Sequence, residues 1–369
     1  MSKERSSIDM ILLTAILMLL VIGLVMVYSA SSVWSDYKFD DAFYYVKRQG
    51  LFALLGLIGI VVMMRMPYVR WLNWSVYLYG ICLLLLIIVL IPGIGMVRGG
   101  AQSWIGIGAF SVQPSEFMKV GMILLFAALL PKLQDRIHLF FNGFLPSLLM
   151  LGVPFALMML QPDLGTGVVF VGTGMVLLFI AGASIKHFML LGGVGIAGFI
   201  GLIVSAPYRM SRITAFLNPW EDPLGDGFQI IQSLYAIGPG GLLGLGFGQS
   251  MQKYFYLPEP QTDFIFAIMA EELGLIGGAF IIGLFFIVVW RGTVIALNVE
   301  DLSASLLAFG ITAMLAIQVM INISVVIGLI PVTGITLPLL SYGGSSLTIT
   351  LMSLGILLNI SQYATIKTS

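Results

Sequence analysis

Charge, cysteine and histidine are all scarce in this sequence, and each shortage excludes a class of protein. Only 9% of the 369 residues are charged and 59% are hydrophobic, whereas a soluble domain carries about 25% charged residues. Because so few charges cannot form a wetted surface, lipid must be the main solvent of the chain. The formal net charge is zero, so there is no general attraction to nucleic acid, and no such partner is expected.

Thiol and imidazole chemistry is nearly excluded as well. The single cysteine, Cys82, lies in an apolar run and cannot form an internal disulfide or a cysteine metal cluster. The two histidines, His138 and His187, stand beside Arg136 and Lys186, in short loops that we expect inside the cell. Chemistry on the opposite side of the membrane must therefore depend on carboxylates, lysine and arginine.

The sequence contains long apolar runs instead of charged segments. The first, Met10 to Val27, has about the length of a membrane span and exceeds the roughly 7–15-residue core of a cleavable signal peptide. We therefore expect a retained helix there. The pattern predicts an all-α polytopic membrane protein, a single transmembrane domain over residues 1–369. About ten helices are expected, near residues 10–30, 49–64, 72–92, 115–131, 145–161, 164–183, 187–206, 263–290, 304–327 and 343–360.

Lysine and arginine in the short loops predict the orientation. The short turns 161–166 and 331–337 carry neither residue, whereas the opposite side is rich in them. The positive-inside rule makes the charged side the cytoplasm, and an even number of spans places both termini there. One large outer loop, about 207–262, is expected between the seventh and eighth helices. The inner positive residues are Lys3, Arg5, Arg65, Arg70, Lys132, Arg136, Lys186, Arg291 and Lys367.

Polar residues at the edges of spans are candidates for function, because charge in a membrane is costly. Glu116 and Lys119 are three residues apart at the start of the fourth predicted helix, so they can pair on one face. A structural ion pair and a direct ligand role remain equal alternatives. Trp104 is either an interfacial belt residue or a stacking platform for a sugar ring. Asp163 lies in a tight turn, where a helix cap is favoured over catalysis.

Two further segments carry weaker signals. Glu221, Asp222 and Asp226 form an acidic stretch that could hold a divalent cation, Mg or Mn. The spacing is not that of an EF-hand, so a solvated acidic turn is favoured. The glycine-rich run 238–248 lacks a βαβ context, which excludes a dinucleotide site. It predicts backbone that approaches a neighbouring segment closely.

Asp263 is the strongest candidate for catalysis. It follows Thr262 at the expected first turn of the eighth helix, where the helix N-terminus favours a carboxylate. The apolar residues 264–266 come next, so partial desolvation should raise the pKa of Asp263. A carboxylate under these two effects can act as a general base. Glu271 and Glu272, about two turns deeper, are expected to pair with polar groups on neighbouring helices.

Several motifs in order along nearly the whole chain resemble the SEDS (shape, elongation, division and sporulation) family of bacterial membrane proteins. They are QPSEFMK, QPDLGT, NPWEDP, QSLYAIGPGG, LPEPQTDFIFA with EELG, and GLIPVTGITLPLLSYGGSS. The sporulation type is the nearest likeness, and a division paralogue is the alternative. The resemblance implies a peptidoglycan glycosyltransferase in the bacterial cytoplasmic membrane. It would polymerise lipid II at the outer face, together with a class B penicillin-binding protein.

The resemblance also implies site residues. The family's essential aspartate maps onto Asp263. The family often has arginine before Trp104, but this chain has Ser103 there, so Arg98 is the nearest substitute cation. The candidate substrate-binding residues are Arg98, Trp104, Glu116, Lys119, Asp163, Arg209, Arg212, Glu221, Gln261, Thr262, Ser341 and Ser345.

The expected reaction joins a sugar 4-hydroxyl to the anomeric carbon of a second sugar and releases undecaprenyl diphosphate. Asp263 would accept the hydroxyl proton. Charge on the leaving diphosphate would be stabilised by cations, with a divalent metal ion as a possible aid; the candidates are Lys119, Arg98, Arg209 and Arg212. A lipid II flippase and a non-catalytic scaffold for a penicillin-binding protein are the alternatives. Polar motifs gathered at one interface favour the enzyme, whose substrate tail would stay among membrane lipids.

Overall fold

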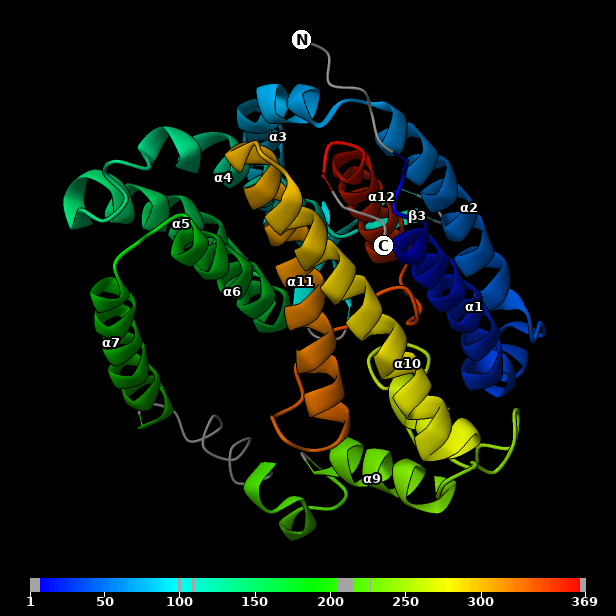
Figure 1. The fold of residues 1–369 in the computed structure, drawn as a ribbon. Coiled ribbons are helices and arrows are strands. Elements are labelled where there is room, and N and C mark those ends of the chain that lie inside the picture. Colours follow the sequence, from blue (N-terminus) through cyan, green and yellow to red (C-terminus); the bar gives the residue numbers. More distant parts are fainter. Residues whose placement is uncertain (1–6, 99–100, 108–109, 205–215, 226, 366–369) are drawn as a thin grey trace.

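The protein is a bundle of long helices with smaller elements at one end (Figure 1). The computed structural model describes residues 7–98, 101–107, 110–204, 216–225 and 227–365. Within this part, seven helical segments are long and apolar enough to cross a membrane, so the chain is a multi-pass membrane protein. The long helices are α1 (Met10–Phe39), α2 (Tyr44–Arg65), α3 (Tyr68–Ile88), α4 (Pro114–Leu129), α5 (Leu145–Leu160), α6 (Leu164–Ile180), α7 (Ile185–Val204), α10 (Ile265–Asn298), α11 (Leu302–Val326) and α12 (Gly344–Ser361).

Several predicted helix boundaries were wrong. Helix α1 continues to Phe39 rather than residue 30, and α10 continues to Asn298 rather than residue 290. A helix of 30 residues spans about 45 Å at about 1.5 Å per residue, and the hydrocarbon core measures only about 30 Å. Hydropathy therefore detects the apolar part of such a helix and misses the turns that extend into the interface.

The expectation of an all-α fold was also incomplete. Residues of the segment 93–114 form a three-stranded antiparallel sheet in the order β1-β2-β3: β1 (Gly95–Arg98), β2 (Ala101–Ile107) and β3 (Phe110–Val112). The expected outer loop contains helix α9 (Phe228–Gly240), which packs against α10 and α11 (Figure 1). The Ser233 hydroxyl donates to the Val326 carbonyl at 2.6 Å and ties α9 to the end of α11.

The start of α1 and the end of α12 meet away from the end of the bundle that carries α9 (Figure 1). The Asp9 amide donates to Ser361 Oγ at 3.2 Å, which joins the start of α1 to the end of α12. Asp9 also pairs with Arg291 of α10 at 2.6 Å, and both side chains are largely buried. This pair helps to fix α1, α10 and α12 relative to one another.

Helix α10 is broken at Gly274, whose φ of 67° and ψ of −168° are not helical. The glycine-rich run supplies backbone partners at the break: the Leu245 amide donates to the Glu271 carbonyl at 2.9 Å, and the Leu275 amide donates to the Gly241 carbonyl at 2.9 Å. A Cβ at Gly244 would lie 2.2 Å from the Glu272 carbonyl oxygen. The predicted close approach of this run is therefore confirmed.

The segment 331–342 enters the bundle as irregular backbone between α11 and α12. A Cβ at Gly23 of α1 would lie 2.3 Å from the Leu339 carbonyl oxygen, and one at Gly165 of α6 would lie 2.5 Å from the Thr333 carbonyl oxygen. Non-helical backbone at membrane depth is tolerated where protein surrounds it. These two glycines make room for the segment, which carries one wall of the candidate site.

Candidate active site

Asp263 lies in the turn that leads into α10, and it is half-buried. The helix begins at Ile265, so the expectation that Asp263 occupies its first turn was wrong. The reason is long-range: Asn322 Nδ2 of α11 donates to the Asp263 carbonyl at 2.7 Å. Among the described residues, no side chain caps α10 at its start. Asp263 is therefore held by its backbone, and its carboxylate does not serve as a helix cap.

The carboxylate of Asp263 is desolvated, which raises its pKa to about 6. Thr262 Oγ1 donates to Asp263 Oδ1 at 3.0 Å and opposes this rise, whereas the negative charge of Glu259 adds to it. The predicted direction of the pKa shift is thus confirmed. A carboxylate with a pKa near 6 is ionised at neutral pH and is still a stronger proton acceptor than an ordinary aspartate.

Glu116 and Lys119 form the predicted ion pair at the start of α4, with 2.9 Å between Lys119 Nζ and Glu116 Oε1. Both side chains are buried. Lys119 Nζ also donates to Gln318 Oε1 of α11 at 3.0 Å. An isolated charge in such a place would be strongly disfavoured, so each partner needs the other.

Helix α11 connects this ion pair to Asp263. Gln318 bonds Lys119, and Asn322 bonds the Asp263 backbone. The two amides are four residues apart, which places them on one helix face about 6 Å apart along the axis. They also donate to the irregular segment, Gln318 to the Thr336 carbonyl at 3.1 Å and Asn322 to the Ile335 carbonyl at 2.7 Å. The sequence analysis missed both residues, although two amides at helical spacing in an apolar run were a visible signal.

Asp163 caps α6, as predicted, by accepting from the Thr166 amide at 3.2 Å. Its other oxygen accepts from Gln113 Nε2 at 2.8 Å and from Ser115 Oγ at 3.0 Å. Because Gln113 and Ser115 precede Glu116, Asp163 positions the start of α4 and with it the buried ion pair. The roles of Gln113 and Ser115 were not predicted.

Gln261 and Ser341 meet beside Asp263. The Tyr342 amide donates to the Gln261 carbonyl at 2.8 Å. Ser341 Oγ accepts from the Leu337 amide at 2.8 Å, and the Ser341 carbonyl accepts from Gln49 Nε2 of α2 at 3.0 Å. Gln49 was also missed by the sequence analysis. These contacts join the turn before α10 to the irregular segment and to α2.

Four buried polar atoms, on the turn before α10, on α11, on the irregular segment and at the start of α12, have no hydrogen-bond partner among the described residues. They are Gln261 Oε1, Asn322 Oδ1, Thr333 Oγ1 and Ser345 Oγ. A buried polar atom left unpaired is destabilising by about 1–3 kcal/mol. Hydroxyl and amide groups of a sugar substrate have the chemistry to satisfy such atoms.

The remaining candidates lie apart or outside the described residues. The backbone of Arg98 ends β1 and pairs with Ala101, while Trp104 is half-buried in β2. Glu221 is exposed in the short helix η3 (Pro219–Glu221). Arg209, Arg212 and Asp226 lie outside the described residues.

Metal-ligand groups do not gather in the described part of the chain, where no three His, Cys, Asp or Glu side chains form a cluster. Glu271 and Glu272 have the structural role that was expected: Glu271 Oε1 accepts from the Met251 amide at 2.8 Å, and Glu272 accepts from Ser29 Oγ of α1 and pairs with Lys253 at 3.4 Å.

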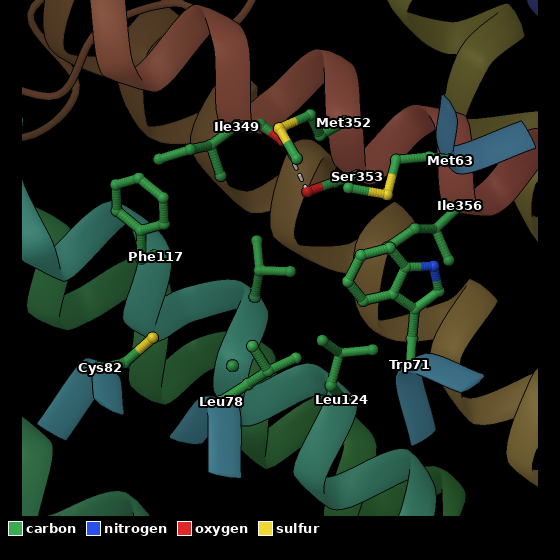
Figure 2. A pocket seen from close by; sticks show the side chains of 12 residues that line it. Met63, Trp71, Leu78, Cys82, Phe117, Leu124, Ile349, Met352, Ser353 and Ile356 are labelled. Carbon is green, nitrogen blue, oxygen red and sulfur yellow. Dashed lines mark hydrogen bonds between the residues drawn. The ribbon is translucent and has the colours of Figure 1, made fainter. Parts of the chain in front are cut away.

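An apolar cavity of about 130 Å³ opens between α2, α3, α4 and α12. Figure 2 shows Trp71, Cys82, Phe117 and Met352 around it. Ser353, a polar member of the lining, donates its hydroxyl to the Ile349 carbonyl at 2.8 Å. Since Phe117 neighbours Glu116 in sequence, the cavity lies along the same helix as the buried ion pair. Its chemistry suits a hydrocarbon chain.

Comparison with known proteins gives relatives over nearly the whole length. The chain is 61% identical over 364 residues to the stage V sporulation protein E of Bacillus subtilis (strain 168), covering 99% of this chain and 100% of that protein. It is 46% identical over 353 residues to the probable peptidoglycan glycosyltransferase FtsW of Geobacter sp. (strain M18), covering 96% of each.

Solved structures share the fold. A chain reported under "Structural coordination of polymerization and crosslinking by a peptidoglycan synthase complex" is similar with a TM-score of 0.80 and 32% identity, covering 96% of this chain and 97% of that one. The rod shape determining protein RodA of Thermus thermophilus gives a TM-score of 0.72 and 29% identity over 98% of each chain. The family model described as cell cycle protein matches residues 10–366. The resemblance indicated by the motifs is confirmed: the chain belongs to the FtsW/RodA/SpoVE family of cell cycle proteins.

Proposed function

We propose that the protein is a peptidoglycan glycosyltransferase that polymerises lipid II at the outer face of the bacterial cytoplasmic membrane. One observation carries the proposal. Helix α11 holds the Asp263 backbone through Asn322 and the buried Lys119 through Gln318, one helical turn apart. The residue that carries the proposed proton acceptor and a buried cation are thus tied to neighbouring turns of one helix, which suits a reaction in which a hydroxyl loses a proton while a diphosphate departs.

The proposed step breaks two bonds, the hydroxyl O–H and the bond to the diphosphate, and forms two, the O–H on the carboxylate and the new glycosidic bond. The Asp263 carboxylate takes the proton of the acceptor sugar's 4-hydroxyl, and the resulting oxygen bonds the anomeric carbon of the donor sugar. The bond from that carbon to the diphosphate oxygen breaks, and its electron pair leaves with undecaprenyl diphosphate. Lys119 stabilises this charge, although Glu116 offsets part of its field at 2.9 Å. Arg98, Arg209 and Arg212 are the further cations proposed for the leaving group.

The topology proposed for this reaction has ten spans, with both termini in the cytoplasm and the loop 207–262 outside, in one transmembrane domain. Lysine and arginine in the short loops support this orientation, as does the contact between Asp9 and Ser361 at one end of the bundle. The turn bearing Asp263 then faces the side where the expected glycan is built.

The proposed partners follow from the same chemistry. The polyprenyl tail of lipid II would lie among membrane lipids and against the apolar cavity beside Phe117. Similarity to a chain of a peptidoglycan synthase complex that coordinates polymerisation and crosslinking supports a class B penicillin-binding protein as partner. A divalent cation, Mg or Mn, also belongs to the proposal, because such ions are commonly held by one or two carboxylates plus substrate phosphates.

The biological role proposed is spore cortex synthesis, since the relative from Bacillus subtilis is a sporulation protein at 61% identity. Division is the second candidate, because FtsW proteins are 46% identical. Polar motifs gathered at one interface favour the enzyme over a flippase, and a scaffold would not need a half-buried aspartate at this turn.

The test is polymerisation of lipid II by purified protein carrying Asp263→Asn. Loss of a general base lowers rates by about 10²–10⁴-fold, so glycan should disappear while folding and partner binding survive. Asp135→Asn is the matched control, since Asp135 is an exposed carboxylate in the loop after α4. Normal glycan synthesis by the Asp263→Asn protein would overturn the proposal.

A further inference from the structure

Aromatic rings form a series in two groups, bridged by the Lys38 ammonium, at the outer ends of α1 and α2, beside the loop that leads into α10. We call this series the aromatic track; its members are Phe255, Tyr37, Trp34, Phe39, Tyr45 and Tyr342. The rings come from four parts of the chain: the end of α1, the start of α2, the loop before α10 and the segment before α12. A single apolar helix face does not produce such a series.

Ring contacts join the members within each group of the track, and the Lys38 ammonium joins the two groups. The Phe255 ring centroid lies 5.3 Å from that of Tyr37 and 5.2 Å from that of Trp34. The Lys38 ammonium bridges the next gap, 5.8 Å from the Trp34 centroid and 5.6 Å from the Phe39 centroid. The series therefore runs across the outer end of α1.

The second half of the track leads to the candidate active site. The Phe39 centroid lies 6.0 Å from that of Tyr45, which lies 4.7 Å from that of Tyr342. The Tyr342 amide donates to the carbonyl of Gln261, two residues before Asp263, at 2.8 Å. One end of the track is thus bonded to the turn that carries the proposed base.

Exposure changes along the track. Tyr37 is 78% exposed and Phe255 is 48% exposed, whereas Tyr45 and Tyr342 are half-buried. Phe255 has a φ of +67°, unusual for a residue other than glycine. Its loop is fixed to α10, because the Met251 amide donates to Glu271 at 2.8 Å. The outer rings are therefore held in place although solvent reaches them.

We propose that the aromatic track binds the saccharide backbone of the nascent glycan strand as it leaves the Asp263 site; this rests on the proposed function. A pyranose ring presents a face of C–H groups, which carry slight positive charge and fit the negative face of an aromatic ring. Tyrosine hydroxyls can bond the sugar hydroxyls at the edges. An uncharged saccharide backbone can be held by repeated contacts with aromatic rings. The rings of the track lie one after another from the site outward, so they can contact successive sugars.

Two simpler roles explain the track less well. Belt residues anchor a protein at the interface and need not contact one another, whereas these rings form an ordered chain that ends at the site. A protein partner would bury the centre of the patch, and lysine is depleted from interface cores. Here Lys38 is exposed and lies over two of the rings.

The test compares full-length purified protein with variants in the exposed half of the track. Tyr37→Ala and Phe255→Leu, alone and together, remove ring faces without emptying the core. Tyr77→Ala is the matched control, because Tyr77 of α3 is 73% exposed and does not belong to the track. The readouts are the initial rate of lipid II consumption and the length distribution of the glycan.

We expect the track variants to consume lipid II at the initial wild-type rate and to release strands that are shorter by about 2- to 10-fold, since an aromatic contact contributes about 0.5–1.5 kcal/mol. A soluble β-1,4-linked N-acetylglucosamine hexasaccharide, titrated calorimetrically, should bind wild-type and Tyr77→Ala protein more tightly than the double variant. Glycan strands of unchanged length from the track variants would overturn the proposal that the track binds glycan. Loss of a co-purifying protein from these variants, without shorter strands, would also overturn it. If wild-type protein makes no glycan, the proposed function fails instead, and the titration still tests the track.

Discussion

Lowering the pH from 7 to 5 should reduce polymerisation about tenfold, because the pKa of Asp263 is raised to about 6 by desolvation. At that pKa about 90% of the carboxylate is ionised at pH 7 and about 9% at pH 5. An aspartate at the model value of 3.8 would remain about 94% ionised at pH 5, and the rate would barely change. The assay is initial glycan synthesis by purified protein between pH 4.5 and 8.

Two neighbouring substitutions test the cause of the shift. Thr262→Val removes a hydrogen bond that lowers the pKa, so the midpoint should move to higher pH. Glu259→Gln removes a negative charge that raises the pKa, so the midpoint should move to lower pH. Movement of both midpoints in one direction, or a wild-type midpoint near pH 4, would refute the reasoning. Because the folded state favours the protonated acid, stability should fall as pH rises from about 4 to about 6, and Asp263→Asn should abolish that fall.

Three other predictions use different parts of the molecule. Glu116→Gln and Lys119→Met should each lower activity and stability, and a double-mutant cycle should show coupling, because one change leaves a buried charge unpaired; additive effects would contradict the ion pair. Asp163→Ala should destabilise the protein by about 1–2 kcal/mol, whereas Asp163→Asn, which retains a cap acceptor, should lose less; equal melting temperatures would exclude the capping role. An introduced cysteine at Gly225 should react with an impermeant thiol reagent in intact cells and one at Lys132 should not; the reverse pattern would invert the topology.

The sequence predicted features that depend on local chemistry. The Asp163 cap follows from a short polar residue in a tight turn, and the Glu116–Lys119 pair follows from helical spacing. The raised pKa of Asp263 follows from its apolar neighbours. In each case the determining residues lie within a few positions of one another.

Features set by distant residues escaped prediction. The start of α10 was placed too early because the Asp263 carbonyl bonds Asn322, 59 residues away, and so is directed out of the helix. Gln113 contacts Asp163 across 50 residues, and Gln49 contacts the Ser341 carbonyl across 292. No window of sequence contains both partners. The strands at 95–112 were missed because hydropathy over a span-length window averages out their short alternation.

The break in α10 has a consequence for biogenesis. Glu271 and Glu272 must enter the membrane with this helix, and a charge at a helix centre opposes insertion by about 2.5–3.5 kcal/mol. The groups that receive them, Ser250, Met251 and Lys253, belong to a segment made earlier by the ribosome. That segment therefore has no partner for these groups until α10 has been synthesised, and the two segments then bind each other. A chain break between this segment and α10 should therefore prevent assembly of the protein, and not only lower the stability of the folded protein.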